Sequence, residues 1–334
     1  MAFRIMLAGG GSGGHVYPLV AIAEEIKRLA PEYHKHVRMR FIGDGVLLAQ
    51  EAKKTGVSCC LILAPKWRRY KSGKNFLDIL KVPVALLQSL FYVWTYMPDV
   101  MLVKGGYAAF FPALAARLMF IPLVVHESDS VPGKTNAYWG RHARRVFVSF
   151  EHAAQFFSSG QAELVGQPIR HEFRALPAIK PHDKPIVFVT GGSQGAQAIN
   201  EIVDLAMAEL SKSFHVIHQR DGSWDAEQMA QAYADADVIV SRAGSAIFEI
   251  AAVGKPAVLI PLDGSAQQHQ LFNAEEFSGH GAIVVPQANL QPHILIHEIQ
   301  RAYDEREKRS LAIRAFAKPD AAMIIAKELL TARR

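Results

Sequence analysis

A chain of 334 residues is long for a single hydrophobic core and has the length expected of two domains. Half of its residues are hydrophobic and 20% are charged, a composition that excludes an intrinsically disordered chain. The net charge of +6 favours an anionic partner, such as a phosphorylated substrate, an acidic membrane surface or a nucleic acid. Its two cysteines, Cys59 and Cys60, are neighbours that cannot form an ordinary structural disulfide with each other, so the chain suits a reducing compartment.

Short apolar runs alternate with segments of helical spacing along the chain, a pattern typical of parallel sheets covered by helices on both faces. In the first half we expect strands at residues 3–8, 37–42, 61–63, 100–103, 122–125 and 146–150. In the second half we expect them at residues 186–190, 214–218, 238–241, 257–261 and 282–285. The sequence therefore predicts two doubly wound α/β domains, with a boundary near residues 166–168, where Pro168 begins a stretch without periodicity.

The first expected strand runs into a glycine loop, Gly9-Gly-Gly-Ser-Gly-Gly14, which is followed by His15. Glycines let a ligand approach the backbone, and the unpaired N–H groups of a helix N-terminus attract a phosphate. The loop also fits the Gly-x-Gly-x-x-Gly dinucleotide pattern, with Asp44 as the acidic residue, so a nicotinamide-dependent enzyme has to be considered. His15 would point at whatever occupies the loop, although the same position suits a capping or core histidine.

Residues 66–81 hold six Lys or Arg and one acidic residue, interleaved with aromatic and aliphatic side chains. The apolar segment 82–97 follows, but polar residues and a proline interrupt it, and it falls short of the roughly 18 to 20 apolar residues of a spanning helix. Cations beside an apolar surface suit the headgroup level of an anionic bilayer, where each contributes about 1 kcal/mol. We therefore predict contact with a membrane surface; the alternative is a basic loop followed by a buried helix.

Polar residues also follow the next expected strands of the first half. Lys104-Gly-Gly-Tyr107 is a second strand-to-helix glycine turn, and His126-Glu-Ser-Asp129 follows the strand after it. The carboxyl ends of parallel strands are where open sheets bind ligands. His126, Glu127 and Asp129 are therefore candidates for acid–base chemistry, or else they cap the helix that comes next.

The second half repeats this layout. Gly191-Gly-Ser-Gln-Gly-Ala196 follows one expected strand, and the stretch from Arg242 to Asn273 begins after another. Each opens a segment with helical spacing, so a pyrophosphate could dock on the helix N-termini without a metal. A tight turn without a ligand is the alternative.

Six motifs occur in one order along the chain: Gly9-Gly-Gly-Ser-Gly-Gly-His15, Gly105-Gly-Tyr107, His126-Glu127 with Pro132-Gly-x-Thr-Asn136, Val165-Gly-Gln-Pro-Ile-Arg170, Gly191-Gly-Ser-Gln-Gly-Ala196 and Glu249-Ile-Ala-Ala-Val-Gly-Lys-Pro256. In this combination, and over nearly its full length, the chain resembles the MurG family of N-acetylglucosaminyltransferases, which complete the lipid-linked peptidoglycan precursor.

The resemblance implies a GT-B glycosyltransferase fold, in which two Rossmann-like domains face a cleft. Residues 1–165 would bind the acceptor and the membrane, residues 166–317 would bind the UDP-sugar, and a C-terminal helix, 318–334, would pack back on the first domain. The implied reaction transfers N-acetylglucosamine from UDP-N-acetylglucosamine to the muramoyl 4-hydroxyl of undecaprenyl-diphospho-muramoylpentapeptide, with inversion. The family works as a peripheral protein on the anionic cytoplasmic face of the cell membrane, and we expect no cofactor, no metal and no nucleic acid.

The positions that match the family's donor-binding motifs are Ser12, Gly13, Gly14, Asp129, Arg170, Ser193, Glu249 and Gln270, and the positions around the reaction centre are His15 and Tyr107. The residues expected to hold the diphosphate are Ser193, Gln194, Gly244 and Ser245. Glu249 would accept both ribose hydroxyls, Gln270 would bind the sugar hydroxyls, and Arg170 would add charge or steady the domain junction. His15 is the expected general base, with Glu127 or Asp129 as substitutes.

The chain departs from the family in three places. Asp129 stands where the family usually has asparagine; residues 220–236 form a segment of only 17 residues, without the apolar element that recognises uracil; and the loop from Arg242 to Glu249 is one residue short. Asp235-Ala-Asp237 matches the Asp-x-Asp pattern of metal-dependent transferases, but helix termination explains this pair better because it precedes its strand. An NAD-dependent oxidoreductase and a divergent, inactive GT-B binding protein are the alternative functions.

Overall fold

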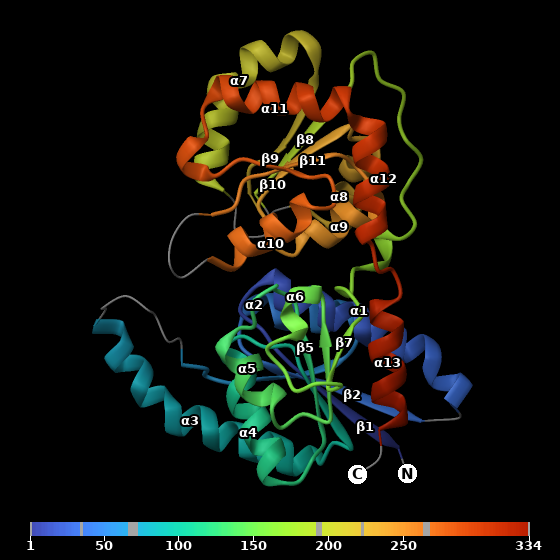
Figure 1. The fold of residues 1–334 in the computed structure, drawn as a ribbon. Coiled ribbons are helices and arrows are strands. Elements are labelled where there is room, and N and C mark those ends of the chain that lie inside the picture. The colour runs from blue at the N-terminus through green and yellow to red at the C-terminus, as the bar shows by residue number, and fades with distance from the viewer. Residues whose placement is uncertain are drawn as a thin grey trace. The chain divides into compact units, whose positions relative to one another are not determined.

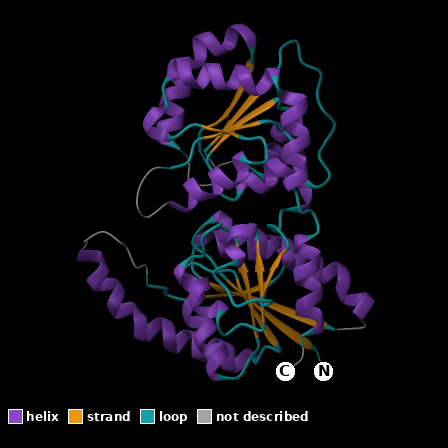
Figure 2. Cartoon of the chain, viewed as in Figure 1, coloured by secondary structure: helices purple, strands orange, loops and turns teal. Residues whose placement is uncertain are grey.

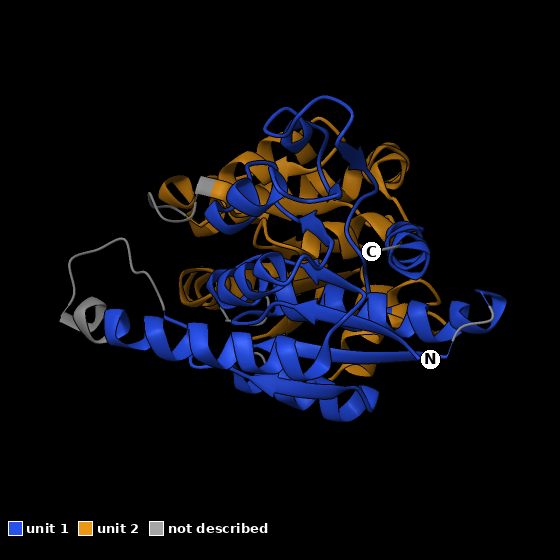
Figure 3. Ribbon diagram, turned by 90° about the horizontal axis from the view of Figure 1, so that it is seen from below, with its two compact units in different colours: residues 1–170, 320–334 blue, residues 171–319 orange. Residues whose placement is uncertain are grey.

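The computed structural model of the chain describes residues 2–33, 36–65, 73–191, 196–221, 224–262 and 268–332 (Figure 1). The chain divides into two compact units (Figure 3). Unit 1 comprises Met1–Arg170 and Asp320–Arg334, and unit 2 comprises His171–Pro319. In each unit the strands form a central sheet, and helices pack on both of its faces (Figure 2).

The described part of unit 1 contains a sheet of seven parallel strands in the order β3-β2-β1-β4-β5-β6-β7. The strands are β1 (Phe3–Ala8), β2 (Val37–Gly43), β3 (Ser58–Leu61), β4 (Val100–Val103), β5 (Leu123–Glu127), β6 (Arg145–Val148) and β7 (Ala162–Leu164). The strand order reverses between β1 and β4. Such a switch point is where an open parallel sheet leaves a crevice for a ligand at its carboxyl edge.

Helices cover this sheet because apolar side chains on one side of each helix pack against apolar side chains on the faces of the strands. The helices of unit 1 are α1 (Gly13–Leu29), α2 (Val46–Thr55), α3 (Gly73–Tyr96), α4 (Phe110–Leu118), α5 (Lys134–Gly140), α6 (Glu151–Ala154) and α13 (Ala321–Thr331). Ile5 and Leu7 of β1 point to one face of the sheet and enter the same core cluster as Leu19 and Ile26 of α1. The first strand and first helix thereby fix the glycine loop between them.

Unit 2 has its own sheet, whose described strands are all parallel in the order β12-β11-β10-β8-β9. The strands are β8 (Ile186–Thr190), β9 (His215–Gln219), β10 (Val238–Ser241), β11 (Ala257–Leu259) and β12 (Ile283–Val284). The helices are α7 (Gln197–Ser213), α8 (Ala226–Asp235), α9 (Ala246–Val253), α10 (Gln268–Ser278), α11 (Pro292–Asp304) and α12 (Arg306–Phe316). The switch point of this sheet lies between β8 and β10.

The predicted pair of doubly wound α/β domains is confirmed, and β1, β4, β8 and β10 have the predicted bounds. The strand predicted at residues 61–63 is wrong: β3 is Ser58–Leu61, and it pairs Ser58 with Arg40 of β2. Leu61 and Leu63 misled the prediction because they are apolar yet 45% and 48% exposed. β7 has no counterpart among the predicted strands, since its Ala-Glu-Leu sequence carries no apolar run.

The last described helix, α13, follows unit 2 in the sequence but packs against α1 of unit 1. Ile325 and Leu329 are fully buried in the same cluster as Ile22 and Ile26. Figure 1 shows α13 in red beside the blue α1. The core of unit 1 is therefore built from both ends of the described chain.

Replacing Leu329 with alanine should lower the free energy of unfolding by about 2–5 kcal/mol, because the change leaves a cavity in this core. Leu311 on α12 is the matched control, since it is 73% exposed and its replacement should cost less than about 0.5 kcal/mol. Chemical denaturation of the two variants measures both values. Equal losses would show that α13 does not complete the core of unit 1.

Candidate active site

Loops after three strands carry most of the sequence-predicted residues of unit 1. They are residues 9–15 after β1, 104–107 after β4 and 126–136 at and after the end of β5, and we call them together the reactive edge. Because the strands are parallel, these loops all lie at the carboxyl edge of the sheet, and two of them flank the switch point between β1 and β4. The structure brings His15, Tyr107, Glu127 and Asp129 to this edge.

Packing between neighbouring loops requires two glycines of this region. A Cβ atom on Gly10 would lie 2.3 Å from the carbonyl oxygen of Asp44, and one on Gly43 would lie 1.7 Å from the carbonyl oxygen of Gly9. The N–H of Gly11 also donates a hydrogen bond of 3.0 Å to the Asp44 carbonyl. The first glycine loop is therefore locked to the loop after β2, whether or not a ligand is bound.

The N-terminus of α1 continues from this loop. Ser12 is its N-cap residue, but its hydroxyl makes no capping hydrogen bond to the helix. Gly13 and Gly14 form the first turn, where backbone N–H groups have no partner within the helix. These three residues form the part of the loop with donors suited to an anion.

His15 lies in the same turn and contacts the second glycine turn, since a Cβ atom on Gly106 would lie 3.2 Å from its Cδ2. Its buried Nδ1 makes no hydrogen bond with the described residues. Burial and the ammonium of Lys104 lower the pKa of His15 to about 4, whereas the carboxylate of Asp129 acts in the opposite direction. The imidazole is therefore neutral at pH 7 and can accept a proton.

Tyr107 connects the first two loops of the reactive edge. Its hydroxyl donates a hydrogen bond of 3.1 Å to Oδ2 of Asp44, and its ring lies close to Gly11. Asp44 is the acidic residue that the nicotinamide interpretation reserves for a ribose. Here its carboxylate is engaged by Tyr107.

Glu127, the last residue of β5, is 3% exposed and holds the loop that follows it. Its Oε1 accepts from the N–H groups of Ser128 at 2.7 Å and Asp129 at 2.9 Å. Its Oε2 accepts from the N–H of Gly133 at 3.0 Å and from Nδ2 of Asn136 at 2.9 Å. Burial and Asp129 raise the pKa of Glu127, while the N–H donors and Lys104 favour its ionised form. Because four donors surround this carboxylate, its geometry suits positioning of the loop better than proton transfer.

His126 is also buried, and its ring contacts Gly166 and Ser149. Its Nε2 lies 3.0 Å from the carbonyl oxygen of Gly166 and 3.3 Å from the hydroxyl of Ser149. Burial, with the nearby ammonium of Lys104, holds the pKa of His126 well below its ordinary value. A neutral imidazole that donates to a backbone carbonyl fits a structural part of the site.

The sequence predicts Lys104 only as the start of a glycine turn. In the structure it is fully buried at the reactive edge, and its ammonium contacts the hydroxyl of Ser128. Burial lowers the pKa of Lys104 to about 8, against the effect of the Glu127 and Asp129 carboxylates. The signal that could have revealed it is a lone lysine between an apolar strand and two glycines.

Arg170, the last residue of the first segment of unit 1, stacks its guanidinium over the ring of Tyr17, with 4.3 Å between the charge centre and the ring centroid. Tyr17 belongs to α1, so this cation–π contact ties the end of that segment to the helix of the first glycine loop.

In unit 2 the sequence-predicted residues follow β8 and β10, the two strands at the switch point, except Gln270, which follows β11. Ser193 and Gln194 lie outside the described residues. Gly244 and Ser245 lead into α9, and a Cβ atom on Gly244 would meet nothing within 4 Å, so packing does not explain this glycine. The space is open to a ligand at a helix N-terminus.

Two further residues of unit 2 present polar groups near that helix. Glu249 lies in the first turn of α9, half-buried, and accepts a hydrogen bond of 3.3 Å from the hydroxyl of Tyr233. Gln270 accepts a hydrogen bond of 3.1 Å from the N–H of Leu262 through Oε1. Both contacts hold these side chains in place, and a carboxylate and an amide are groups that suit the hydroxyls of a ligand.

Hydrogen bonds and an aromatic contact stabilise the described part of the short segment between β9 and β10. Asp225 caps α8 by accepting from the N–H of Gln228 at 2.8 Å, and Oε1 of Gln228 accepts from the Asp225 N–H at 3.0 Å. Trp224 stacks on Phe188 of β8 with ring centroids 5.9 Å apart. A capped helix and an aromatic stack thus stabilise the described part of this segment.

The carboxylates of Asp235 and Asp237 accept hydrogen bonds from backbone N–H groups. Asp235 Oδ1 accepts from the N–H of Lys180 at 2.9 Å, and Asp237 Oδ2 accepts from the N–H of Ile186 at 2.8 Å. Within the described ranges, no three or more His, Cys, Asp or Glu residues gather in a way that could hold a metal ion.

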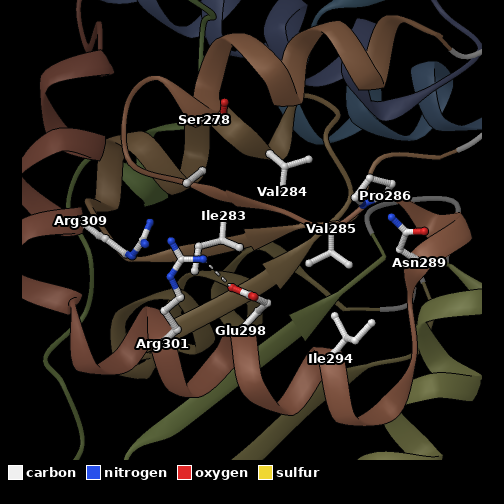
Figure 4. Close-up of a pocket in the computed structure, with 11 residues that line it drawn as sticks. Ser278, Ile283, Val284, Val285, Pro286, Asn289, Ile294, Glu298, Arg301 and Arg309 are labelled. Carbon is white, nitrogen blue, oxygen red and sulfur yellow. Dashed lines mark hydrogen bonds and ion pairs between the residues drawn. The ribbon is translucent and has the colours of Figure 1, made fainter.

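A pocket of about 500 Å³ lies elsewhere in unit 2 (Figure 4). Its wall includes Ile283 of β12 and Ile294 of α11, and Arg301 pairs there with Glu298 at 3.2 Å. The sequence-predicted residues do not line it, and Arg301 is neutralised within α11, so the pocket is not part of the candidate site.

Two family models match the chain. That of the glycosyltransferase family 28 N-terminal domain matches residues 5–148, and that of the C-terminal domain matches residues 186–231 and 226–327. The C-terminal match comes in two pieces that meet inside the short segment before β10.

Relatives and solved structures agree with these matches. The chain is 35% identical to the UDP-N-acetylglucosamine–N-acetylmuramyl-(pentapeptide) pyrophosphoryl-undecaprenol N-acetylglucosamine transferase of Syntrophus aciditrophicus, over 91% of this chain and 90% of that one. It is 34% identical to the transferase of the same name from an Anaeromyxobacter species, over 97% and 92%. The crystal structure of Acinetobacter baumannii MurG superposes with a TM-score of 0.75 at 24% identity, covering 98% of this chain and 99% of that one.

The low pKa of His15 predicts a pH dependence of stability. The unfolded chain binds a proton at His15 near the ordinary pKa of 6.5, but the folded chain does so only near 4. Stability from this residue is therefore fully present above about pH 6.5 and is lost as the pH falls toward 4. Between pH 7 and pH 5 the wild type should lose at most about 2 kcal/mol more than a His15→Asn variant. Urea unfolding at both pH values measures the difference, and parallel curves for the two proteins would contradict the buried, neutral state of His15.

Proposed function

The chain belongs to glycosyltransferase family 28, among the MurG N-acetylglucosaminyltransferases, and from this premise we propose the reaction that it catalyses. It transfers N-acetylglucosamine from UDP-N-acetylglucosamine to the muramoyl 4-hydroxyl of undecaprenyl-diphospho-muramoylpentapeptide, a step of peptidoglycan biosynthesis. The observation that carries this proposal is the similarity above 30% identity, over nine-tenths of the chain, to transferases named for this reaction. The polar loops at both switch points support it.

The reaction balances without a cofactor. The acceptor oxygen attacks the anomeric carbon of N-acetylglucosamine, the bond from that carbon to the diphosphate breaks with inversion, and UDP leaves. The hydroxyl proton must pass to a base, and the growing charge on the diphosphate must be stabilised.

His15 is the base in this proposal. Its imidazole is neutral at pH 7, and it lies between two glycine turns at the switch point. Its low pKa makes it a weak base in the absence of substrate, but the negative charge of a bound diphosphate would raise that pKa. Tyr107 and Glu127 then serve by fixing the loops around it, and the amides of Gly13 and Gly14 with the hydroxyl of Ser12 bind an anionic group.

The donor site in this proposal lies at the switch point of unit 2. The N-terminus of α9 at Gly244 and Ser245, together with Ser193 and Gln194, binds the diphosphate of UDP. Glu249 accepts the ribose hydroxyls, while Gln270 binds the sugar. Arg170 and Asp129 of unit 1 match the family's donor-binding positions by resemblance alone, and of the two only the cation Arg170 would attract a diphosphate.

A membrane surface is the proposed place of the reaction. Leu80, Val84, Leu87, Phe91 and Trp94 recur every three or four residues along α3 and form a line that we call the α3 stripe. Every member is at least 40% exposed, whereas Ala85, Ser89 and Val93 on the opposite side of the helix are fully buried. A helix with an apolar line toward solvent is unusual for a soluble protein.

The buried side of α3 packs against α4 (Figure 1). Residues 78–96 are long and apolar enough to cross a membrane, but a helix that is packed on its own domain along one side is better suited to lying in the headgroup region of a bilayer. We place the α3 stripe on the anionic cytoplasmic face of the cell membrane, since the sequence of residues 66–81 supplies six Lys or Arg to attract that face. Of these residues, 66–72 lie outside the described structure.

Substitutions in the two proposed half-sites should separate donor binding from chemistry. His15→Asn should lower kcat by about 10²- to 10⁴-fold, because it removes the general base, while UDP still protects the protein against thermal unfolding. Glu249→Ala should instead abolish that protection, because it removes the acceptor for the ribose hydroxyls. Transfer of labelled N-acetylglucosamine to the lipid acceptor and the UDP-induced rise in Tm are the two readouts.

NADH serves as the control ligand for the alternative functions. A thermal shift with NADH but not with UDP would replace the transferase by an oxidoreductase. Protection by UDP without any transfer would assign the chain to the inactive binding proteins. Equal effects of the two variants on both readouts would contradict the proposed division of roles.

Replacing Leu87, Phe91 and Trp94 with glutamine should weaken binding to anionic phospholipid vesicles at least ~10-fold, since each large apolar side chain gains about 1.5–3 kcal/mol on full burial. The matched control is Leu205→Gln with Leu311→Gln, two side chains exposed by 72% and 73% in unit 2. Vesicle sedimentation measures the binding. Unchanged binding, with a loss of self-association in gel filtration, would assign the α3 stripe to a contact between copies of the chain.

A further inference from the structure

Lys104 is held in a place where a lysine is costly to keep charged. It follows β4 directly, and its backbone N–H donates a hydrogen bond of 2.9 Å to the carbonyl oxygen of Ala8 at the end of β1. Its side chain is fully buried, and a Cβ atom on Gly9 would lie only 3.3 Å from its Cβ. The ammonium therefore sits at the switch point itself, enclosed by protein, where an uncompensated charge is strongly unfavourable.

Compensation for this charge comes from the loop after β5. The ammonium donates to the hydroxyl of Ser128, and the carboxylates of Glu127 and Asp129 on either side of Ser128 both favour its charged form. Ser128 passes the contact on, since its hydroxyl donates to Oε1 of Gln167 at 2.9 Å. Through Ser128 the buried lysine is thereby connected with Gln167, near the end of the first segment of unit 1.

On its other side Lys104 acts on histidines. Its charge lowers the pKa of His15 on α1, and it also lowers that of His126 at the end of β5. Asp129 acts on His15 in the opposite sense. The titratable groups that interact with the ammonium are thus two carboxylates and two neutral imidazoles, and they come from α1, β5 and the loop after β5.

We propose that Lys104 is a positioning residue of the transfer reaction: its buried ammonium, bonded to Ser128 between Glu127 and Asp129, balances these two carboxylates at the reactive edge that also holds His15. The inference rests on the proposed function, because it concerns the edge that holds the base named there. Without the ammonium, the two carboxylates would leave a negative reactive edge that repels a diphosphate. With it, an aspartate is tolerated next to an anionic substrate.

The first test uses the ligand-free protein and no activity. In ¹⁵N-histidine NMR, the His15 signals are assigned by their loss in His15→Asn and are then titrated in the wild type and in Lys104→Met. Methionine is an unbranched side chain one atom shorter than lysine, and it carries no charge. The midpoint of the His15 titration should move upward by about one pH unit. An unchanged midpoint would overturn the control of His15 by Lys104, whatever reaction the protein catalyses.

The second test is a double-mutant cycle on transfer activity. Lys104→Met should lower kcat/KM for the lipid acceptor by about 10- to 100-fold, with its acid limb moved to higher pH, because the carboxylates lose their counter-charge. Adding Asp129→Asn should restore at least about tenfold of that loss, because it removes one of the two negative charges. Simple additivity of the two losses would overturn the charge balance and leave Lys104 a packing residue.

Lys255→Met is the control for losing a half-buried lysine away from the reactive edge. Lys255 in unit 2 donates a hydrogen bond of 2.9 Å to the carbonyl oxygen of Ala234, and burial lowers its pKa as well. Its replacement should leave the His15 midpoint unchanged, and a shift there would mean that the effect of Lys104→Met is not local. If the wild type shows no transfer at all, the proposed function fails, while the NMR titration still decides the inference about Lys104.

Discussion

The hydrogen-bonded carboxylate of Glu127 is the interaction on which the reactive edge of unit 1 depends. It ends a buried strand, where water cannot satisfy its oxygens, and it draws three backbone N–H groups and one side-chain amide toward itself. Those four donors fix the course of residues 128–136. The positions of Ser128 and Asp129, and through them the surroundings of Lys104 and His15, follow from that course. A single buried acid therefore organises a loop that has little apolar surface of its own to pack.

The electrostatics of this edge follow from the same burial. Low polarity around His15 and Lys104 disfavours their charged forms, so the histidine is neutral and the lysine titrates near pH 8. The ammonium of Lys104 also lowers the tendency of His15 to be charged. A site of this kind is poised to receive negative charge, because an arriving anion stabilises every protonated form within it. The direction of these shifts fits a group transfer in which a diphosphate departs and a hydroxyl gives up its proton.

Much of this arrangement could be predicted from the sequence, because it depends on local signals. β1, β4, β8 and β10 are apolar runs that end at glycines, and they are the central strands whose ends form the two switch points. The residues that escaped prediction are those whose role comes from tertiary contacts. Nothing in the order Lys-Gly-Gly-Tyr reveals that Lys104 is enclosed, and the sequence does not show that four donors of residues 128–136 turn back toward Glu127. At the sheet edges the apolar pattern is weak, which explains the displaced β3 and the missed β7. The sequence predicts an apolar segment here, but it does not show which side of the helix is exposed. That depends on the packing of α4 against the side opposite the α3 stripe.

The return of α13 to unit 1 has a consequence for how the protein is made. Ribosomes deliver the chain in order, so all of unit 2 is synthesised before the helix that completes the core of unit 1. Until α13 emerges, Ile22 and Ile26 of α1 lack their covering and present an apolar surface on the nascent chain. Unit 2 has every one of its strands before that moment and can fold first, although it comes second in the sequence. The half of the protein that carries the reactive edge is thus finished last, and its unfinished form is the one that chaperones would meet.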